Sequence, residues 1–370
     1  MKATTTTAGE TPQAQSIEEI MDIASAAFHA GEFLFIEGRS GGGKSTIANE
    51  IGDRLGIAKD RRSLANFNGA MPSQVRGQLM PDPAKRESWY TAPTEIPLRK
   101  DVGDEPWLQV IDELPACAPE IQALFHGLLS PDGIPRIGDH ELPKQLFVIL
   151  TGNRRQDAAT TNTVQSPIIG RSACVEWLPS IQSWIDHEGA AAATSPIAAF
   201  LKYAGKAGSD LADFFCPAPP KPWRGSVYPQ PRKWSKVLHG FDKYPSDPAR
   251  QNKVIAANVG QTAADACCAF ITLAKSVLPI LDGVIAGTCG LPRDPQKRYS
   301  IAHCAIRRLV DAAGDDAGAT LASGALDPII EKVILPLDPE MRAWAFDAIK
   351  TAGVPIDQHP LQEKLQNLSS

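Results

Sequence analysis

The chain has 370 residues, of which 43% are hydrophobic and 21% are charged. This is the composition of an ordinary globular protein, and it argues against wholesale disorder, a collagen-like repeat or a small disulfide-rich scaffold. At roughly 100–200 residues per domain, the length predicts two or three domains. The formal net charge is -5, so the strongly basic surface of many nucleic-acid-binding proteins is not expected.

Cysteine usage and the N-terminus indicate a reducing compartment. There are seven cysteines and none forms a CxxC pair, so we expect free thiols and no zinc site. Residues 1–15 are polar, lack the apolar stretch of a signal peptide, and predict a flexible N-terminal segment of a cytoplasmic protein. The most apolar stretch, residues 267–285, is interrupted by Lys275 and Asp282 and predicts a buried helix, not a membrane span.

A strand, a turn and a helix are predicted near the N-terminus. Ser16 and Glu19 have the spacing of a capping box, and apolar residues then recur at helical spacing until Gly31. The apolar run 33–36 predicts a buried strand. A glycine-rich turn follows it, and residues 44–55 again have a helical pattern.

Short apolar runs farther along predict the rest of an α/β core. Strands are expected at 107–111, 146–150 and 173–178, with a weaker one at 64–67, a helix at 118–129 and a hairpin within 134–143. Strands that alternate with helices predict a parallel five-stranded sheet covered on both faces, in a core of residues 16–178. Two all-helical regions are expected after it, 179–275 and 276–370.

The glycine-rich turn fits the phosphate-binding loop motif GxxxxGK[ST]. Residues 38–45 have the sequence GRSGGGKS between a predicted strand and a predicted helix. Glycines let backbone N–H groups turn toward phosphate oxygens, Lys44 would reach the β- and γ-phosphates, and Ser45 would bind Mg²⁺. The residues expected to bind ATP are Gly38, Ser40, Gly41, Gly42, Gly43, Lys44, Ser45 and Thr46.

A second motif overlaps this loop. Residues 38–42 also satisfy GxSxG, the nucleophile elbow of hydrolases, which likewise follows a strand. That interpretation leaves Lys44 and Ser45 unexplained, and it needs a downstream acid and histidine as well. The phosphate-binding loop is therefore favoured.

Two carboxylates follow the predicted strand 107–111. The C-terminal end of a strand in an α/β sheet points into the crevice where ligands bind. Asp112 would hold the Mg²⁺ shell, as a Walker B aspartate does, and Glu113 would polarise the attacking water as general base. A solvated acidic turn is the structural alternative, and the phosphate-binding loop upstream favours the catalytic interpretation.

With these motifs, the chain resembles a MoxR-type AAA+ ATPase, a group that includes CbbQ-type activases and the ATPase subunit of cobaltochelatase. The resemblance covers Ser16 to about Lys275. Besides the Walker pair, residues 114–129 are similar to the helix after Walker B, and residues 133–153 to the hairpin before the sensor strand. PQPRKW, at 229–234, is similar to the lid motif, which makes 179–275 a lid. The loop lacks the proline that the family usually has in its second or third position.

The resemblance implies roles for polar residues outside the Walker motifs. Asn153 would be sensor 1, which orients the lytic water. Arg171 would be the arginine finger that reaches the γ-phosphate of a neighbouring subunit, with Arg154 and Arg155 as rivals for that role. Arg232 would be the second sensor, a lid arginine that contacts the nucleotide of its own subunit. A turn asparagine and solvated surface arginines are the structural alternatives.

The function that the resemblance implies is that of an ATP-hydrolysing machine with Mg²⁺. It would form a homo-oligomeric ring, with a hexamer as the favoured size, and remodel or activate a protein client, directly or through an adaptor. Neither a membrane nor a nucleic acid is expected as a partner.

Three other classes of function share parts of this pattern. A P-loop small-molecule kinase needs no ring and no arginine from a neighbour. A nucleic-acid motor or clamp loader predicts turnover stimulated by DNA, against which the net charge argues. A binding scaffold with a vestigial site would not need the intact Lys44, Ser45, Asp112 and Glu113.

Overall fold

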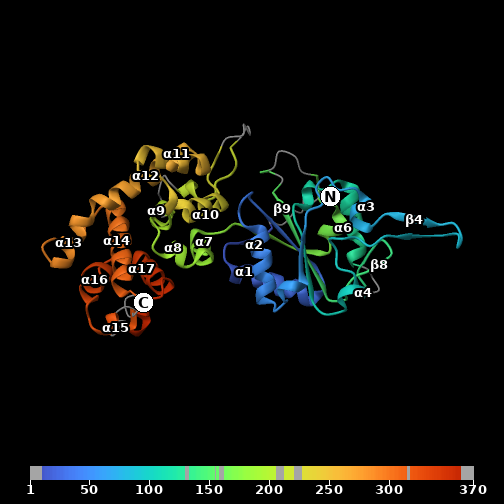
Figure 1. The fold of residues 1–370 in the computed structure, drawn as a ribbon, viewed down its shortest axis with the longest axis horizontal. Coiled ribbons are helices and arrows are strands. Elements are labelled where there is room, and N and C mark those ends of the chain that lie inside the picture. The colour runs from blue at the N-terminus through green and yellow to red at the C-terminus, as the bar shows by residue number, and fades with distance from the viewer. Residues whose placement is uncertain are drawn as a thin grey trace, which may run out of the picture. The chain divides into compact units, whose positions relative to one another are not determined.

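The chain folds into two compact units, Met1–Ser180 and Ile181–Ser370 (Figure 1). The structure is a computed structural model, and it describes residues 11–129, 133–154, 156–157, 162–205, 212–220, 227–314 and 317–359. Within these residues the first unit contains all the strands, and the second contains only helices and turns. We call them the sheet unit and the helical unit.

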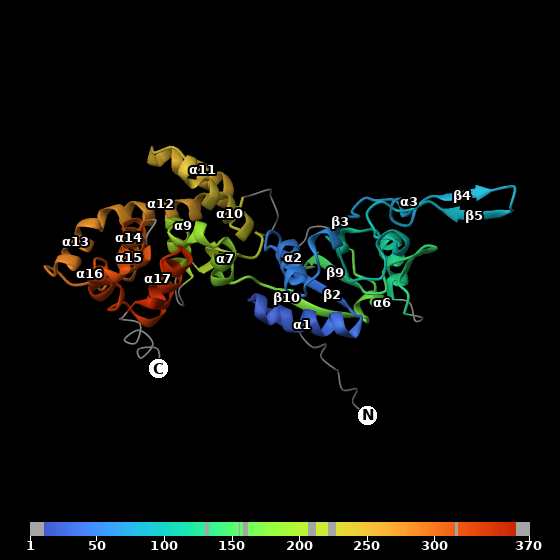
Figure 2. The same ribbon diagram turned by 60° about the horizontal axis from the view of Figure 1, so that its bottom comes forward.

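A parallel sheet forms the centre of the sheet unit (Figure 2). In their order across the sheet, its strands are β1 (Gln13–Ala14), β10 (Ser172–Trp177), β2 (Phe33–Gly38), β9 (Leu146–Asn153), β6 (Trp107–Ile111) and β3 (Arg62–Ala65). Every neighbouring pair is parallel. The expected α/β fold is thus confirmed, and each of the five strands predicted from the sequence overlaps its expected range.

The sheet has six strands where five are expected, because the N-terminal segment adds an edge strand. Residues 1–15 predict flexibility, and this prediction is wrong for Gln13 and Ala14, which pair with Glu176 and Trp177. The Glu176 N–H donates to the Pro12 carbonyl at 2.8 Å, and Ala14 is 1% exposed. Backbone groups make this pairing, so a polar side-chain pattern gives no sign of it.

Helices cover both faces of the sheet. They are α1 (Ile17–Ala30), α2 (Lys44–Arg54), α3 (Pro72–Arg76), α4 (Arg99–Val102), α5 (Pro119–Leu124) and α6 (Ser166–Ile169). Successive strand residues point to opposite faces. Along β2, Leu34 and Ile36 share a buried core with α1 and α2, whereas Phe35 packs in the core on the other face with α3, α5 and α6.

Local signals set the ends of α1 as expected. The Ser16 hydroxyl accepts a hydrogen bond from the Glu19 N–H at 3.3 Å, and the Glu19 carboxylate accepts one in return from the Ser16 N–H. Gly31 ends the helix in the left-handed conformation, with φ of 68°. The next residues enter β2 at once, so the capped helix fixes where the central strand begins.

Two hairpins extend from the sheet unit: β4 (Leu79–Asp82) with β5 (Glu87–Tyr90), and β7 (Arg136–Ile137) with β8 (His140–Glu141). The second lies where the sequence predicts a hairpin. The first is not predicted, and it projects away from the sheet in Figures 1 and 2. Its cross-strand partners Met80 and Trp89 remain 39% and 53% exposed. Since it has no buried face, hydrophobic alternation does not reveal it.

The helical unit is built around a single large core. Its helices are α7 (Ile181–Glu188), α8 (Ala190–Ala193), α9 (Pro196–Ala204), α10 (Pro231–Gly240), α11 (Pro248–Val259), α12 (Gln261–Ser276), α13 (Leu278–Ala286), α14 (Pro295–Ala313), α15 (Ala317–Ala322), α16 (Asp327–Ile329) and α17 (Pro339–Thr351). Phe200, Trp234, Phe270 and Tyr299 are at most 1% exposed and belong to this core. Helices before and after residue 275, treated separately in the sequence analysis, therefore pack together.

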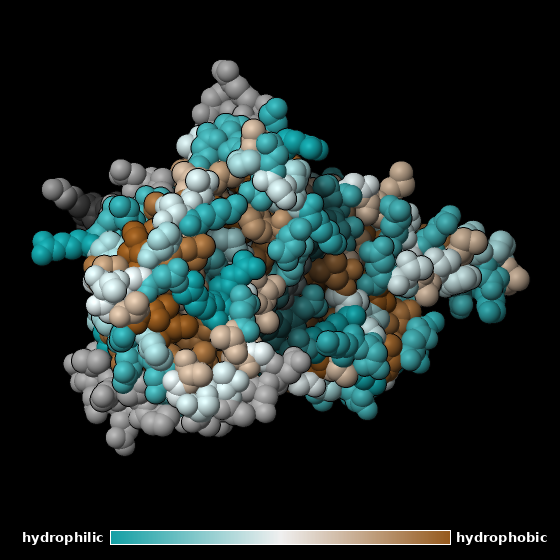
Figure 3. Space-filling model, turned by 60° about the vertical axis from the view of Figure 1, so that its left-hand side comes forward, coloured by the Kyte–Doolittle hydropathy of each residue, from teal (hydrophilic) through white to brown (hydrophobic). Residues whose placement is uncertain are grey.

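Apolar side chains also reach the surface of the chain. Figure 3 shows them in brown, interspersed with polar residues in teal, on the side where the helical unit comes forward. Among the described residues no single helix has the length and apolar composition needed to cross a membrane, although α12 and α13, bent by 41° at their junction, pass that test as a pair.

Gly152→Ala is expected to destabilise the sheet unit. A Cβ at this position in β9 would lie 2.6 Å from Cγ of Pro115, in the turn after β6. Overpacking of this kind costs about 1–3 kcal/mol. Urea unfolding should therefore show a lower midpoint than for the wild type. In Gly290→Ala the new Cβ meets no atom within 4 Å, so the midpoint should not fall. Equal midpoints for the two variants would contradict tight packing of Pro115 on β9.

Candidate functional site

The loop between β2 and α2 depends on its glycines. Gly41 and Gly43 have φ of 73° and 83°, a conformation that side chains with a Cβ rarely adopt. A Cβ at Gly38 would lie 2.5 Å from the Trp177 carbonyl oxygen, so a larger residue does not fit beside β10. The loop thus connects the end of β2 to the N-terminus of α2, where free backbone N–H groups attract anions.

Lys44 connects this loop to a neighbouring strand. It is the first residue of α2 and is only 8% exposed. Its Nζ donates to the carbonyl oxygens of Gly38 and Arg39, at 3.2 and 3.0 Å, and to Asn153 Oδ1 at 2.8 Å. The ammonium group is therefore held over the loop and against the end of β9.

A second contact connects α2 to the end of β6. Ser45 Oγ donates to Asp112 Oδ1 at 3.1 Å, and the buried hydroxyl of Thr151 in β9 donates to the same oxygen. The Asp112 N–H donates to the Ala65 carbonyl in β3 at 2.8 Å. Two elements therefore hold the Asp112 carboxylate, and β3 holds its backbone. Sequence reasoning missed Thr151, which lies inside an apolar strand and belongs to no motif.

Glu113 has a strained backbone. Its φ is 57° and its ψ is 40°, and in the part of the chain that the structure describes only Arg86 shares a positive φ among non-glycine residues. Such a conformation costs about 1–3 kcal/mol and is concentrated at functional sites. The Glu113 N–H donates to Thr151 Oγ1 at 3.2 Å. The strain therefore turns the chain directly after Asp112.

The sheet order explains why these residues meet. Asn153 is the last residue of β9 and lies opposite Gly38 in the register of β2. Because β9 lies between β2 and β6, the C-terminal ends of three adjacent parallel strands meet at one edge. The structure thus brings together Lys44, Ser45, Asp112 and Asn153, as the sequence analysis expects.

Arg171 lies at the opposite, N-terminal ends of the strands. It directly precedes β10, its side chain is exposed, and its carbonyl accepts a hydrogen bond from the N–H of Phe33, the first residue of β2. The phosphate-binding loop follows Gly38, at the other end of that strand. The five rises of about 3.3 Å from Phe33 to Gly38 separate the two ends by about 17 Å. Arg171 therefore does not reach the loop of its own chain.

The rival Arg154 has partners in its own chain. Its guanidinium pairs with Asp157 and with Glu176 of β10, and its side chain is 13% exposed. Burial and the nearby Glu176 raise the pKa of Glu37 on the adjacent strand β2. The positive charge of Arg154 partly offsets this rise in pKa. This network occupies Arg154 and disfavours it as an arginine finger. Arg155, the other rival, lies outside the described residues.

Other predicted site residues take no part in these contacts. Ser40 and Thr46 are exposed, at the tip of the loop and in the first turn of α2. Arg232 is exposed in the first turn of α10, in the helical unit, and its role as second sensor stays a prediction. Trp234, two residues on, is fully buried and donates its indole N–H to the Phe214 carbonyl at 2.7 Å, so it packs within the helical unit.

Trp177 supports the loop and was not recognised in the sequence. It ends β10, is 5% exposed, and donates its indole N–H to the Gly42 carbonyl at 2.8 Å. The contact spans 135 residues of sequence, so no local motif contains it. The sequence shows a tryptophan at the end of a predicted strand. Only the sheet order shows that this strand, β10, lies next to β2, which carries the loop.

The residues present suit a nucleotide and a Mg²⁺ ion. The adjacent Ser45 hydroxyl and Asp112 carboxylate are oxygen donors of the kind that Mg²⁺ prefers. The Lys44 ammonium, bonded here to backbone carbonyls, can exchange these partners for phosphate oxygens at the start of α2. Fold and site together define a P-loop α/β protein.

Comparisons with known proteins give only a distant likeness. No protein-family model and no curated protein matches the sequence. Among solved structures, the chain is similar to Hsp104 of S. cerevisiae in its ADP complex, with 13% identity over 47% of this chain, 36% of the Hsp104 chain and a TM-score of 0.33. It is also similar to NtrX from Brucella abortus, with 14% identity over 93% of this chain, 70% of NtrX and a TM-score of 0.35.

Trp177→Phe is expected to weaken ATP binding without unfolding the protein. The variant keeps an aromatic ring but loses the hydrogen bond that holds Gly42. A hydrogen bond contributes about 0.5–1.5 kcal/mol, which corresponds to an increase in Kd of roughly twofold to tenfold. Calorimetric titration with ATP measures this. Trp184→Phe is the matched control, because its indole donates to Ser235 in the helical unit. An unchanged Kd in Trp177→Phe would show that the loop does not need this support.

Proposed function

We propose that this protein is a MoxR-type AAA+ ATPase that hydrolyses ATP in a homo-oligomeric ring, favoured as a hexamer, and remodels or activates a protein client. One observation carries the ATPase assignment: Lys44 contacts Asn153 while Ser45 contacts Asp112. The lysine, the acid and the asparagine that this function requires are therefore adjacent at the C-terminal ends of neighbouring strands. The client and the ring rest on the sequence resemblance, and the cytoplasmic location rests on the cysteine usage and the polar N-terminal sequence. All three are parts of the proposal.

The chain's own groups bind and orient the triphosphate. Backbone N–H groups of the loop and of the start of α2 surround the phosphates, and Lys44 supplies a point charge to the β- and γ-phosphates. Ser45 and Asp112 hold Mg²⁺, which neutralises charge that develops on the phosphate oxygens. The contact between Thr151 and Asp112 keeps that carboxylate in position.

Glu113 is the proposed general base. It directly follows the metal-binding carboxylate, and its strained backbone directs it away from the path of β6. A carboxylate there accepts a proton from water as the water attacks the γ-phosphate. Asn153 orients the same water from the neighbouring strand. The two groups come from the ends of the adjacent strands β6 and β9.

Arg171 is the proposed arginine finger and acts on a neighbouring subunit. Its position at the far edge of the sheet prevents action on its own loop. In a ring that presents this edge to the next subunit, the exposed guanidinium supplies positive charge where negative charge develops in the transition state. In a monomeric kinase an arginine so placed would be an ordinary surface residue.

Glu113→Gln is expected to bind ATP normally and to hydrolyse it about 10²–10⁴-fold more slowly, because an amide is too weak a base. Asp112→Asn should instead raise the Mg²⁺ concentration needed for activity. Phosphate release measured over a Mg²⁺ titration separates the two effects. Glu120→Gln, an exposed carboxylate on α5, is the control and should match the wild type. Wild-type turnover in both site variants would make the acidic strand end structural.

Arg171→Ala is expected to bind ATP and to lose about 10³-fold or more of its hydrolysis. Lys44→Ala should bind no ATP, because it lacks the charge that holds the phosphates. Mixing the two inactive proteins should restore part of the turnover, since an intact Lys44 site can then face an intact Arg171. Lys100→Ala, which removes an exposed cation on α4, is the control and should keep full activity. If the variants assemble together and no mixture recovers activity, Arg171 does not act in trans.

A further inference from the structure

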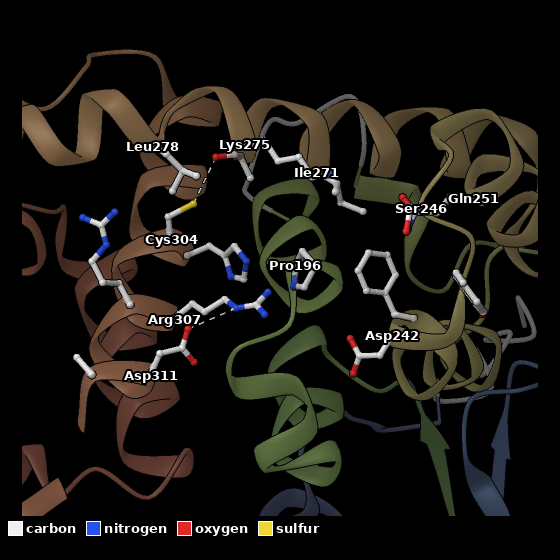
Figure 4. Close-up of a pocket in the computed structure, with 16 residues that line it drawn as sticks. Pro196, Asp242, Ser246, Gln251, Ile271, Lys275, Leu278, Cys304, Arg307 and Asp311 are labelled. Atoms are coloured by element: carbon white, nitrogen blue, oxygen red, sulfur yellow. Dashed lines mark hydrogen bonds and ion pairs between the residues drawn. The ribbon is translucent and has the colours of Figure 1, made fainter. Parts of the chain in front are cut away.

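A pocket of about 810 Å³ opens within the helical unit, between α9, α12 and α14 (Figure 4). This volume is within the range of small-molecule sites, about 300–1,000 Å³. Much of the lining is apolar and comes from separate elements, with Pro196, Phe241, Tyr244, Ile271 and Leu278 among its residues. All lining residues belong to one compact unit, so the site is complete without the sheet unit.

A buried histidine in this pocket has one ring nitrogen with no hydrogen-bond partner among the described residues. His303 on α14 lines the pocket and is 4% exposed, and its Nδ1 is buried with no partner in the described chain. Burial and then the nearby Arg307 lower its pKa to about 4, so the ring is neutral at physiological pH. An unsatisfied buried polar atom costs about 1–3 kcal/mol. A ligand that bonds to this nitrogen would remove that cost.

Charged groups of both signs line the pocket, Arg308 and Asp311 of α14 among them. Lys275 of α12 and Arg307 of α14 are basic, and Figure 4 shows Asp242 on the far side from them. In the described residues the exposed side chains of Lys275 and Asp242 have no hydrogen bond or ion pair. Arg307 pairs only loosely with Asp311, at 3.8 Å and with both side chains more than 60% exposed. These charges are therefore free to bind a ligand.

We propose that this pocket binds a small ligand with one carboxylate, one ammonium group and an apolar side chain, as a free amino acid or a short peptide has. The carboxylate pairs with Lys275 and Arg307, the ammonium group pairs with Asp242, and the side chain packs on Phe241 and Ile271. A plain anion would leave Asp242 unpaired, and a plain amine would face the two cations. The neutral His303 ring bonds to the ligand between these ends.

Four probes test the charge requirement. L-Phenylalanine and the dipeptide Phe-Phe carry both charges, whereas 3-phenylpropionate lacks the ammonium group and 2-phenylethylamine lacks the carboxylate. Calorimetry with the full chain should show saturable binding of phenylalanine or the dipeptide, at least about tenfold tighter than either analogue. A preference for one of the first two distinguishes a free amino acid from a peptide.

Variants locate the binding. Lys275→Gln and Asp242→Asn change exposed side chains, so the fold should survive, and each should weaken binding of the preferred probe about tenfold. Lys297→Gln, an exposed residue of α14 that does not line the pocket, is the matched control and should bind normally. Lys44→Ala should also bind the probe normally, so this test is independent of the ATPase proposal. The imidazole nitrogen signals of His303, assigned with His303→Gln, should shift on binding.

Several results would overturn the proposal. One is that neither phenylalanine nor the dipeptide shows saturable binding up to about 10 mM, because a Kd above that concentration means that the pocket barely binds the probe. Equal binding of 3-phenylpropionate would remove the role of Asp242 and with it the ligand class. Equal loss in Lys297→Gln would show that the probes bind elsewhere.

Discussion

Parallel pairing of β2 with β9 and of β9 with β6 is the constraint on which the candidate site depends. Adjacent parallel strands end on the same side of the sheet. Asn153 and Asp112 therefore have to lie near the loop that follows Gly38. The contact between the Lys44 ammonium and Asn153 Oδ1, at 2.8 Å, is the direct result. A shift of one residue in either pairing would turn the strand residues to the other face and separate these groups.

The same register separates functions between the two edges of the sheet. The groups proposed to bind and cleave the triphosphate gather at the C-terminal ends of the strands, and Arg171 lies at the N-terminal ends beside Phe33. One chain therefore offers a nucleotide site at one edge and an exposed arginine at the other. Under the proposed mechanism, Arg171 of one subunit acts on the triphosphate of the next, which is why the arginine-finger and ring proposals depend on each other.

The helical unit combines a closely packed apolar core with a pocket that contains a buried polar atom. Its core is apolar and closely packed around Phe200, Trp234 and Tyr299, yet α14 places His303 in a pocket without a partner for Nδ1. Folding tolerates few such atoms, because each loses its hydrogen bonds to water and gains none. Among the described residues, this unsatisfied nitrogen beside the polar groups Lys275 and Asp242 is what distinguishes the pocket from a simple gap in packing.

The sequence by itself determined the features that local pattern encodes: the capped helix after Ser16, the apolar core strands, the phosphate-binding loop, and the acid pair at the end of 107–111. These signals are short-range, because helix caps, strand periodicity and loop glycines depend on neighbours a few residues away. Only the tertiary structure decided the rest. The edge strand at Gln13, the hydroxyl of Thr151 on Asp112 and the indole of Trp177 on Gly42 join residues far apart in the chain. Backbone pairing and long-range packing make these contacts, and neither leaves a periodic trace in the sequence.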